Sequence, residues 1–190
     1  SAIQELSKKY IFLQNNITNY NKIIESSKLV LNENNINFLN MNPKQCKHLC
    51  ISKSYFNINN NNNNNKNKLT NYCIALKDNE VIGVITDVIS DLINTSKFVI
   101  EKDNSLLNKE YVELLVINNN NMEINIGDYL CVSDVPGYLM KQNENYRINN
   151  SICKSLTNVN WNSNDVISNV KLINYKNENY KCMLIKVKFV

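Results

Sequence analysis

Two thiols and an imidazole form the cluster in this 190-residue sequence that is best suited to binding a metal ion. Cys46, His48 and Cys50 alternate with other residues in Cys46-Lys-His-Leu-Cys50, and His48 is the only histidine. On a β-strand the three side chains would point to one face. A structural zinc site needs a fourth ligand, from Cys73 or another subunit, and the usual Cys-x2-Cys spacing is missing. We therefore expect buried thiols beside a surface histidine, with no resident metal and no cofactor.

A serine nucleophile with a lysine base is one possible catalytic pair, and the residues that suggest it are Ser1, Lys8 and Lys9. A Ser–His–Asp set would have to use His48, and no nucleophile-elbow glycine pattern surrounds a serine. No phosphate-binding loop or dinucleotide fingerprint is present either. We assign no catalytic residue. A self-cleaving peptidase, cut just before Ser1, is kept as an alternative, although an ordinary chain boundary is the better explanation of Ser1.

Sugar binding is a second kind of chemistry that the composition allows. The chain has ten tyrosines and many asparagines, and its one tryptophan lies in Asn160-Trp-Asn-Ser163. Trp161 is either an exposed platform for stacking or an anchor in the core. The alternative function that follows is a monomeric β-sandwich that binds glycan or protein, with the N-terminal helix folded onto it.

The first 30 residues predict a helix. Apolar residues recur in alternating steps of three and four over about three heptads, which is the a/d pattern of a coiled coil. A stripe this narrow fits another helix better than a broad sheet, although a helix packed on its own domain is the simpler arrangement. The expected oligomer seam consists of Ile3, Leu6, Tyr10, Leu13, Ile17, Tyr20 and Ile24.

Residues 43–190 predict a β-rich domain, because short apolar runs alternate there with turn signals. The fold class that we expect is mainly β, a sandwich or barrel-like domain of many short strands. A loop is expected at 31–41, an expanded asparagine loop at 57–68, and a helical turn at 87–94. The expected strands are 49–56, 72–76, 81–85, 97–100, 111–117, 122–126, 129–132, 138–141, 152–156, 170–175 and 181–190.

Composition excludes several classes of function. Net charge is +4, and Arg147 is the only arginine among 21 basic residues, so we expect no nucleic-acid partner. No apolar run is long enough to span a bilayer, so we expect no membrane partner. The six cysteines sit in apolar stretches, which favours buried free thiols over disulfides. Asparagine accounts for 41 of 190 residues, and this bias, with lysine and isoleucine, is typical of an AT-rich genome.

All three glycines fall in one ordered arrangement. Val81-Ile-Gly-Val-Ile85 comes first. A Gly-Asp turn with positive φ then enters a strand, a Ser-Asp pair caps the next turn, and Pro-Gly fits the centre of a type II turn. The predicted result is a hairpin-like corner. The residues that form these turns are Gly83, Gly127, Asp128, Ser133, Asp134, Pro136, Gly137 and Tyr138.

This order of elements resembles the C-terminal autocleaving intramolecular-chaperone domain of phage neck-appendage and tail-spike proteins. In that family a strand of the type VIGVVS precedes a segment of the type GDYV…SDxxGxAxK, then a strand with GK and a terminal hydrophobic strand. The match covers roughly residues 79–190. Cys153 stands where the pattern carries glycine, Leu139 replaces a small residue, and the Trp- and Arg-rich stretch before the Gly-Asp turn is absent. No cleavage site matches, so self-cleavage is not carried over.

The resemblance implies a β-rich trimer with a helical segment that drives the assembly of a viral fibre or appendage. It also implies a virus-encoded protein, made in the host cytoplasm and present in the virion, with a glycan or host-surface molecule as a possible ligand. Together with the heptads, it predicts a non-catalytic homo-oligomerisation module with residues 1–30 as its helix and 43–190 as its assembly domain.

Overall fold

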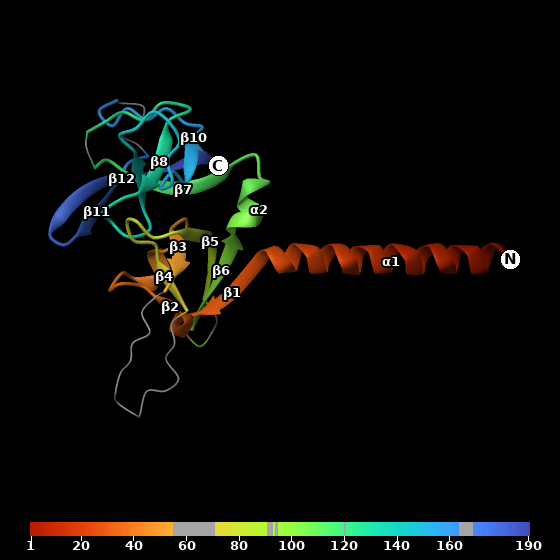
Figure 1. Ribbon diagram of the computed structural model, residues 1–190. Coiled ribbons are helices and arrows are strands. Elements are labelled where there is room, and N and C mark those ends of the chain that lie inside the picture. The colour runs from red at the N-terminus through yellow and green to blue at the C-terminus, as the bar shows by residue number, and fades with distance from the viewer. Residues whose placement is uncertain (55–70, 91–92, 94, 120, 164–168) are drawn as a thin grey trace.

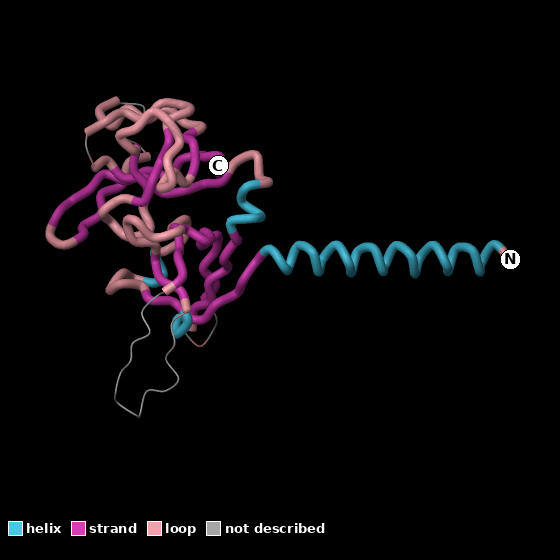
Figure 2. The backbone as a smooth tube through the Cα atoms, in the orientation of Figure 1, coloured by secondary structure: helices cyan, strands magenta, loops and turns pink. Residues whose placement is uncertain are grey.

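The computed structural model describes residues 1–54, 71–90, 93, 95–119, 121–163 and 169–190, and the side chains of these residues except 17–27. The chain is mainly β, as predicted, and consists of a two-sheet head with one long helix, α1 (Ala2–Ser27), projecting from it (Figures 1 and 2). The first half of α1 is rich in good helix formers such as Ala2, Glu5 and Leu6. The helix passes directly into β1 (Lys28–Asn32), without a linker.

The first sheet has the strand order β1-β6-β5-β3-β4-β2 and is open. All its pairings are antiparallel except that of β2 with β4. β5 carries a bulge between Ile85 and Asp87. The remaining elements of this half of the head are the 3-10 helices η1 (Glu33–Asn35) and η2 (Pro43–Gln45) and the strands β2 (Ile36–Asn37), β3 (Cys50–Lys53), β4 (Tyr72–Ile74), β5 (Val81–Ser90) and β6 (Ser96–Lys102).

The second sheet closes into a small barrel. Its order is β10-β8-β9-β7-β12-β11, and β10 also pairs with β12, where Cys153 faces Phe189. A short helix, α2 (Asp103–Leu107), leads into it and buries Leu106. The strands are β7 (Val112–Ile117), β8 (Tyr129–Val132), β9 (Leu139–Lys141), β10 (Cys153–Ser155), β11 (Lys171–Tyr175) and β12 (Glu178–Phe189).

Alternation along β12 explains how the barrel fills its interior. Ile185, Val187 and Phe189 are buried, whereas Leu184 and Lys186, which alternate with them, are exposed. This is the period-two pattern of a half-buried strand, as the sequence predicts. A second apolar cluster lies where the barrel meets the open sheet, and it combines residues such as Ile74 and Phe98 with Val135 and Tyr138. The two sheets therefore share a core.

Several local expectations were wrong. A helical turn was expected at 87–94, but residues 87–90 are strand, because β5 continues to Ser90 and pairs with β6; residues 91, 92 and 94 lie outside the described part of the chain. Residues 31–41 are not a plain loop, since β1 and β2 lie there, and the head begins at Lys28 rather than at 43. At 122–126 the structure has a single bridge, Ile124 to Val159. The asparagine loop 57–68 lies outside the described residues.

Candidate functional site

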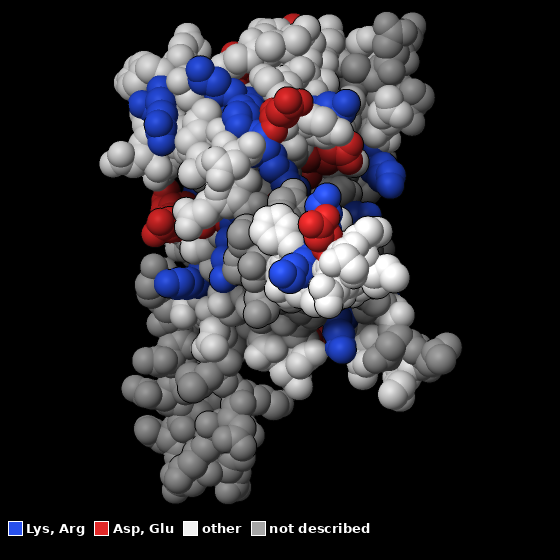
Figure 3. Space-filling view, turned by 90° about the vertical axis from the view of Figure 1, so that its right-hand side faces the viewer, with Lys and Arg blue, Asp and Glu red and all other residues white. Residues whose placement is uncertain are grey.

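The predicted oligomer seam lies on α1, away from the head. The side chains of Ile3, Leu6, Tyr10 and Leu13 are 81%, 68%, 62% and 58% exposed. Ile17, Tyr20 and Ile24 belong to the same helix, but their side chains are outside the described residues. In the view along α1, uncharged side chains dominate the end of the helix, and basic and acidic groups are interspersed over the head behind it (Figure 3). Ile3, Leu6, Tyr10 and Leu13 thus have no cover from the described part of the head.

The predicted turn at 133–138 forms, and it joins the two sheets. Tyr138 N–H donates to Val135 O at 3.2 Å and Gly137 has φ +81°, as in a type II turn. The Ser133 hydroxyl accepts from Val135 N–H at 3.1 Å. Gly137 then donates its N–H to Ala75 O at 2.8 Å and accepts from Cys50 N–H at 3.1 Å. The loop of one sheet is therefore hydrogen-bonded to the strand ends of the other.

Gly137 sits in this joint with no room for a side chain. A Cβ atom there would lie 2.8 Å from Ile74 Cγ2 and 2.9 Å from Leu49 Cβ. Asp134, in contrast, lies at the surface, where it pairs with Lys77 at 3.4 Å and accepts from Asn119. Gly83 is the third residue of β5, where a Cβ would lie 2.6 Å from Glu101 O.

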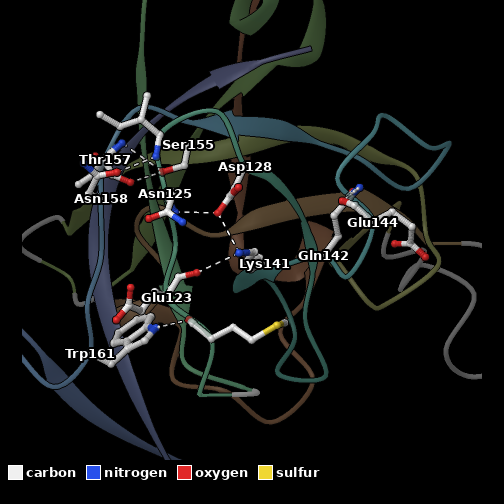
Figure 4. A network of polar contacts seen from close by, with 12 residues as sticks. Glu123, Asn125, Asp128, Lys141, Gln142, Glu144, Ser155, Thr157, Asn158 and Trp161 are labelled. Atoms are coloured by element: carbon white, nitrogen blue, oxygen red, sulfur yellow. Dashed lines mark hydrogen bonds and ion pairs between the residues drawn. The ribbon is translucent and has the colours of Figure 1, made fainter.

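The Gly-Asp turn forms at the edge of the barrel. Gly127 has φ +92°, and Asp128 N–H donates to Asn125 O at 3.0 Å. Asp128 Oδ2 accepts from Asn125 N–H at 2.7 Å and pairs with Lys141 Nζ at 3.1 Å (Figure 4). Lys141 Nζ also donates to Glu123 O at 3.2 Å. Sequence reasoning missed Lys141 as a site residue, although the Gly-Asp to Lys spacing of the motif carries this pair.

Cys46, His48 and Cys50 do not lie on one strand, which is the arrangement that the weaker metal-site alternative would need. Residues 46–49 make a turn, with Leu49 N–H donating to Cys46 O at 3.3 Å, and β3 begins only at Cys50. His48 has φ +70°, outside the β region, and is half-buried, whereas both cysteines are buried. Within the described residues, no group of three His, Cys, Asp or Glu side chains could hold a metal ion. The two thiols are buried, as expected, whereas His48 is half-buried rather than fully at the surface.

All six cysteines are free, and five of them are buried. Burial raises the pKa of the Cys46 and Cys50 thiols to about 12, and it raises the pKa of Cys131 to about 11. The pKa of Cys153 also lies well above its usual value because of burial. These thiols behave as small apolar side chains in the core.

The two remaining candidates are Trp161, considered for stacking against a sugar, and Ser1, considered as a nucleophile. Trp161 is 3% exposed and its Nε1–H donates to Met122 O at 3.1 Å, so it is a core anchor and not a stacking platform. Ser1 lies before the first residue of a 26-residue helix, about 40 Å from its C-terminal end. Its hydroxyl accepts a long contact from Gln4 N–H at 3.5 Å.

Comparisons with family models, curated proteins and solved structures gave no match. Among the described residues, no helix has both the length and the apolar character that a membrane span needs.

Proposed function

We propose that the chain is a homo-oligomerisation module, in which α1 forms a parallel coiled coil with α1 of two further copies. The observation that carries this proposal is the uncovered stripe of Ile3, Leu6, Tyr10 and Leu13. An isolated helix is marginal in water, and α1 contains asparagines at 15, 16, 19 and 21 that weaken it further. Packing of its stripe against other helices would supply the missing stabilisation.

The flanking positions of the heptads support a copy of the same chain as the partner. In coiled coils, charges at positions e and g set the choice of partner. Here these positions hold Ser7 and Lys9 in the first heptad, Gln14 and Asn16 in the second, and Asn21 and Ile23 in the third. With one charge among six residues, this helix carries no dense charge pattern that would require an oppositely charged partner. When identical helices align in parallel, the a and d residues of one copy pack against the same residues of the others.

The trimeric state and the viral-fibre setting rest on the resemblance to the phage appendage domains. The trimer places three heads side by side at the end of one stalk, which suits the end of a fibre or appendage. Under this proposal the protein has a structural role and catalyses no reaction.

Replacing two stripe residues tests the proposal. Leu6→Lys with Leu13→Lys buries charge in the seam, so we expect the solution mass to fall from three times 22.0 kDa to that of one chain. Light scattering across the micromolar range measures this mass. The matched control is Ile11→Lys with Phe12→Lys, because Ile11 and Phe12 are also exposed on α1, at 53% and 65%, but lie off the stripe.

The control variant should keep the mass of the native chain. A native chain that is monomeric would overturn the assembly function. A native mass of two chains would keep the coiled coil and overturn the trimer. Equal effects of the two double variants would show that the stripe is not the seam.

A further inference from the structure

A groove of about 520 Å³ lies between the loop that follows β2 and the hairpin of β11 and β12. Both segments lie on the side of the head away from α1 (Figure 1). Leu39 and Asn40 in the loop have φ +53° and +64°. Positive φ is costly for a residue such as leucine, and strained backbone of this kind occurs where the surroundings hold a functional geometry. The groove volume is in the range of ligand sites.

Tyr138 supplies the polar group at the bottom of this groove. Its side chain is 6% exposed, yet it lines the groove, and its hydroxyl has no hydrogen-bond partner among the described residues. The hydroxyl oxygen does not belong to the fully buried polar atoms that lack a partner, so it remains accessible from outside the core. Burial raises the pKa of Tyr138 to about 12, so the hydroxyl stays protonated and can donate. The hydroxyl is thus positioned to bond a ligand.

The rim of the groove carries amides whose bonding capacity is partly unused. Asn42 Oδ1 accepts from Lys44 N–H at 3.1 Å, which leaves its NH2 group available. Asn174 Nδ2 donates to Asn179 Oδ1 at 3.0 Å, which leaves its own Oδ1 available. An amide offers both donors and an acceptor, as vicinal hydroxyl groups require.

Charge and apolar lining limit the class of ligand. Among the described lining residues none is acidic, and Lys176 is the one cation, with its Nζ 5.4 Å from the centre of the Tyr175 ring. A strongly charged ligand would find little compensation here. Leu39, Met41 and Ile173 add apolar surface. The lining therefore favours an uncharged molecule that has hydroxyl groups on its edge and C–H groups on its faces.

We propose that this groove binds a neutral saccharide, with the Tyr138 hydroxyl bonding a sugar hydroxyl at the base and the amides of Asn42 and Asn174 bonding others at the rim. Trp161 takes no part in it. The site belongs to the head alone, so it does not depend on the coiled coil. A monomeric chain that binds the sugar would retain this proposal while the proposed function fails.

Saturation-transfer NMR on the full chain tests the site with lactose, maltose, cellobiose, chitobiose and mannobiose as probes. We expect at least one of them to bind. Tyr138→Phe removes a single hydroxyl and keeps the packed ring, so it should weaken binding about 3- to 10-fold, as loss of one neutral hydrogen bond does. The control is Tyr146→Phe, because Tyr146 is 68% exposed and does not line the groove. It should leave affinity unchanged.

Three outcomes would overturn the proposal. The first is that none of the five sugars binds. The second is that a sugar binds with equal affinity to native protein and to both Tyr138→Phe and Asn174→Ala, which would place it elsewhere. The third is that a tryptic digest of casein binds and the sugars do not, which would make the groove a peptide site. The dispersion of amide signals in each spectrum verifies that the variant is folded.

Discussion

Two glycine turns from the same sequence motif have different roles in this molecule. The turn at Gly127 lies at the edge of the barrel, where an added Cβ would meet nothing within 4 Å. The turn at Gly137 is hydrogen-bonded between the two sheets, and an added Cβ would collide with Ile74 and Leu49. Both glycines have positive φ, at +92° and +81°. The comparison teaches that backbone conformation is local, while the cost of losing a glycine depends on what lies around it.

Gly137→Ala is the strongest test of this difference. Positive φ costs alanine about 1–2 kcal/mol, and overpacking adds about 1–3 kcal/mol. We therefore expect the free energy of unfolding to fall by about 2–5 kcal/mol. Chemical denaturation measures this value. A loss below that of Gly127→Ala would show that the joint accommodates a methyl group.

Asp128→Ala tests whether side-chain contacts stabilise the turn at Gly127. The turn at Gly137, in comparison, is stabilised by its packing and hydrogen bonds between the two sheets. This change removes the ion pair with Lys141 and the acceptor for Asn125 N–H. We expect a loss of about 1–3 kcal/mol, since the pair is only partly exposed and the backbone donor loses its partner. Asp128→Asn is the matched control and should cost less, because its amide oxygen still accepts. Denaturant midpoints in low and high salt separate the charge from the hydrogen bond.

Gly127→Ala should have a smaller effect, about 1–2 kcal/mol, because only the positive φ is penalised. Gly127→Asn should be milder still, since asparagine tolerates the left-handed region. Thermal unfolding of the two variants beside Gly137→Asn provides the comparison. If asparagine were tolerated equally at both positions, packing around Gly137 would not distinguish the two turns.

The smallest expected effect concerns pH at the joint. Burial and then the charge of Lys47 lower the pKa of His48 below 6.5. A lowered pKa means that the folded state favours neutral His48, so its stabilising contribution is full above the unfolded pKa and is lost as pH falls through the folded one. We expect the melting temperature to drop slightly more between about pH 7 and pH 5 in the native chain than in His48→Gln. Equal pH slopes would contradict the shift.

Sequence reasoning succeeded where structure is decided by neighbouring residues. The type II turn at Pro136-Gly137, the positive φ of Gly127 and the strand alternation at Met183–Phe189 all follow from local chemistry. Sequence reasoning failed where the structure depends on contacts between segments that are far apart in the sequence. The pairing of β10 with β12 closes the barrel and joins residues 153–155 to 187–189, which no local pattern encodes. The groove at Tyr138 likewise needs segments near 40, 138 and 174.

The cysteine–histidine segment shows why its metal-site alternative was weak. Its period-two spacing would place three ligands on one face only in a strand, but Pro43 starts the 3-10 helix η2, and His48 takes a positive φ before β3 begins. A single alternating pattern over five residues is too short to exclude a turn. The helix α1, in contrast, could be predicted because its apolar residues recur in steps of three and four over about three heptads, and a helix repeats its own geometry.

The direct passage of α1 into β1 also sets a mechanical load path. Tension applied to the N-terminal end of the helix enters the head through an edge strand, which is held to β6 by five residue pairs, from Lys28–Glu101 to Asn32–Lys97. No slack chain intervenes to absorb it. The joint around Gly137 and the closed barrel lie farther along the chain. We therefore expect the pairing of β1 with β6 to break before they do. A force–extension record would register the detachment of β1 from β6 as the first step.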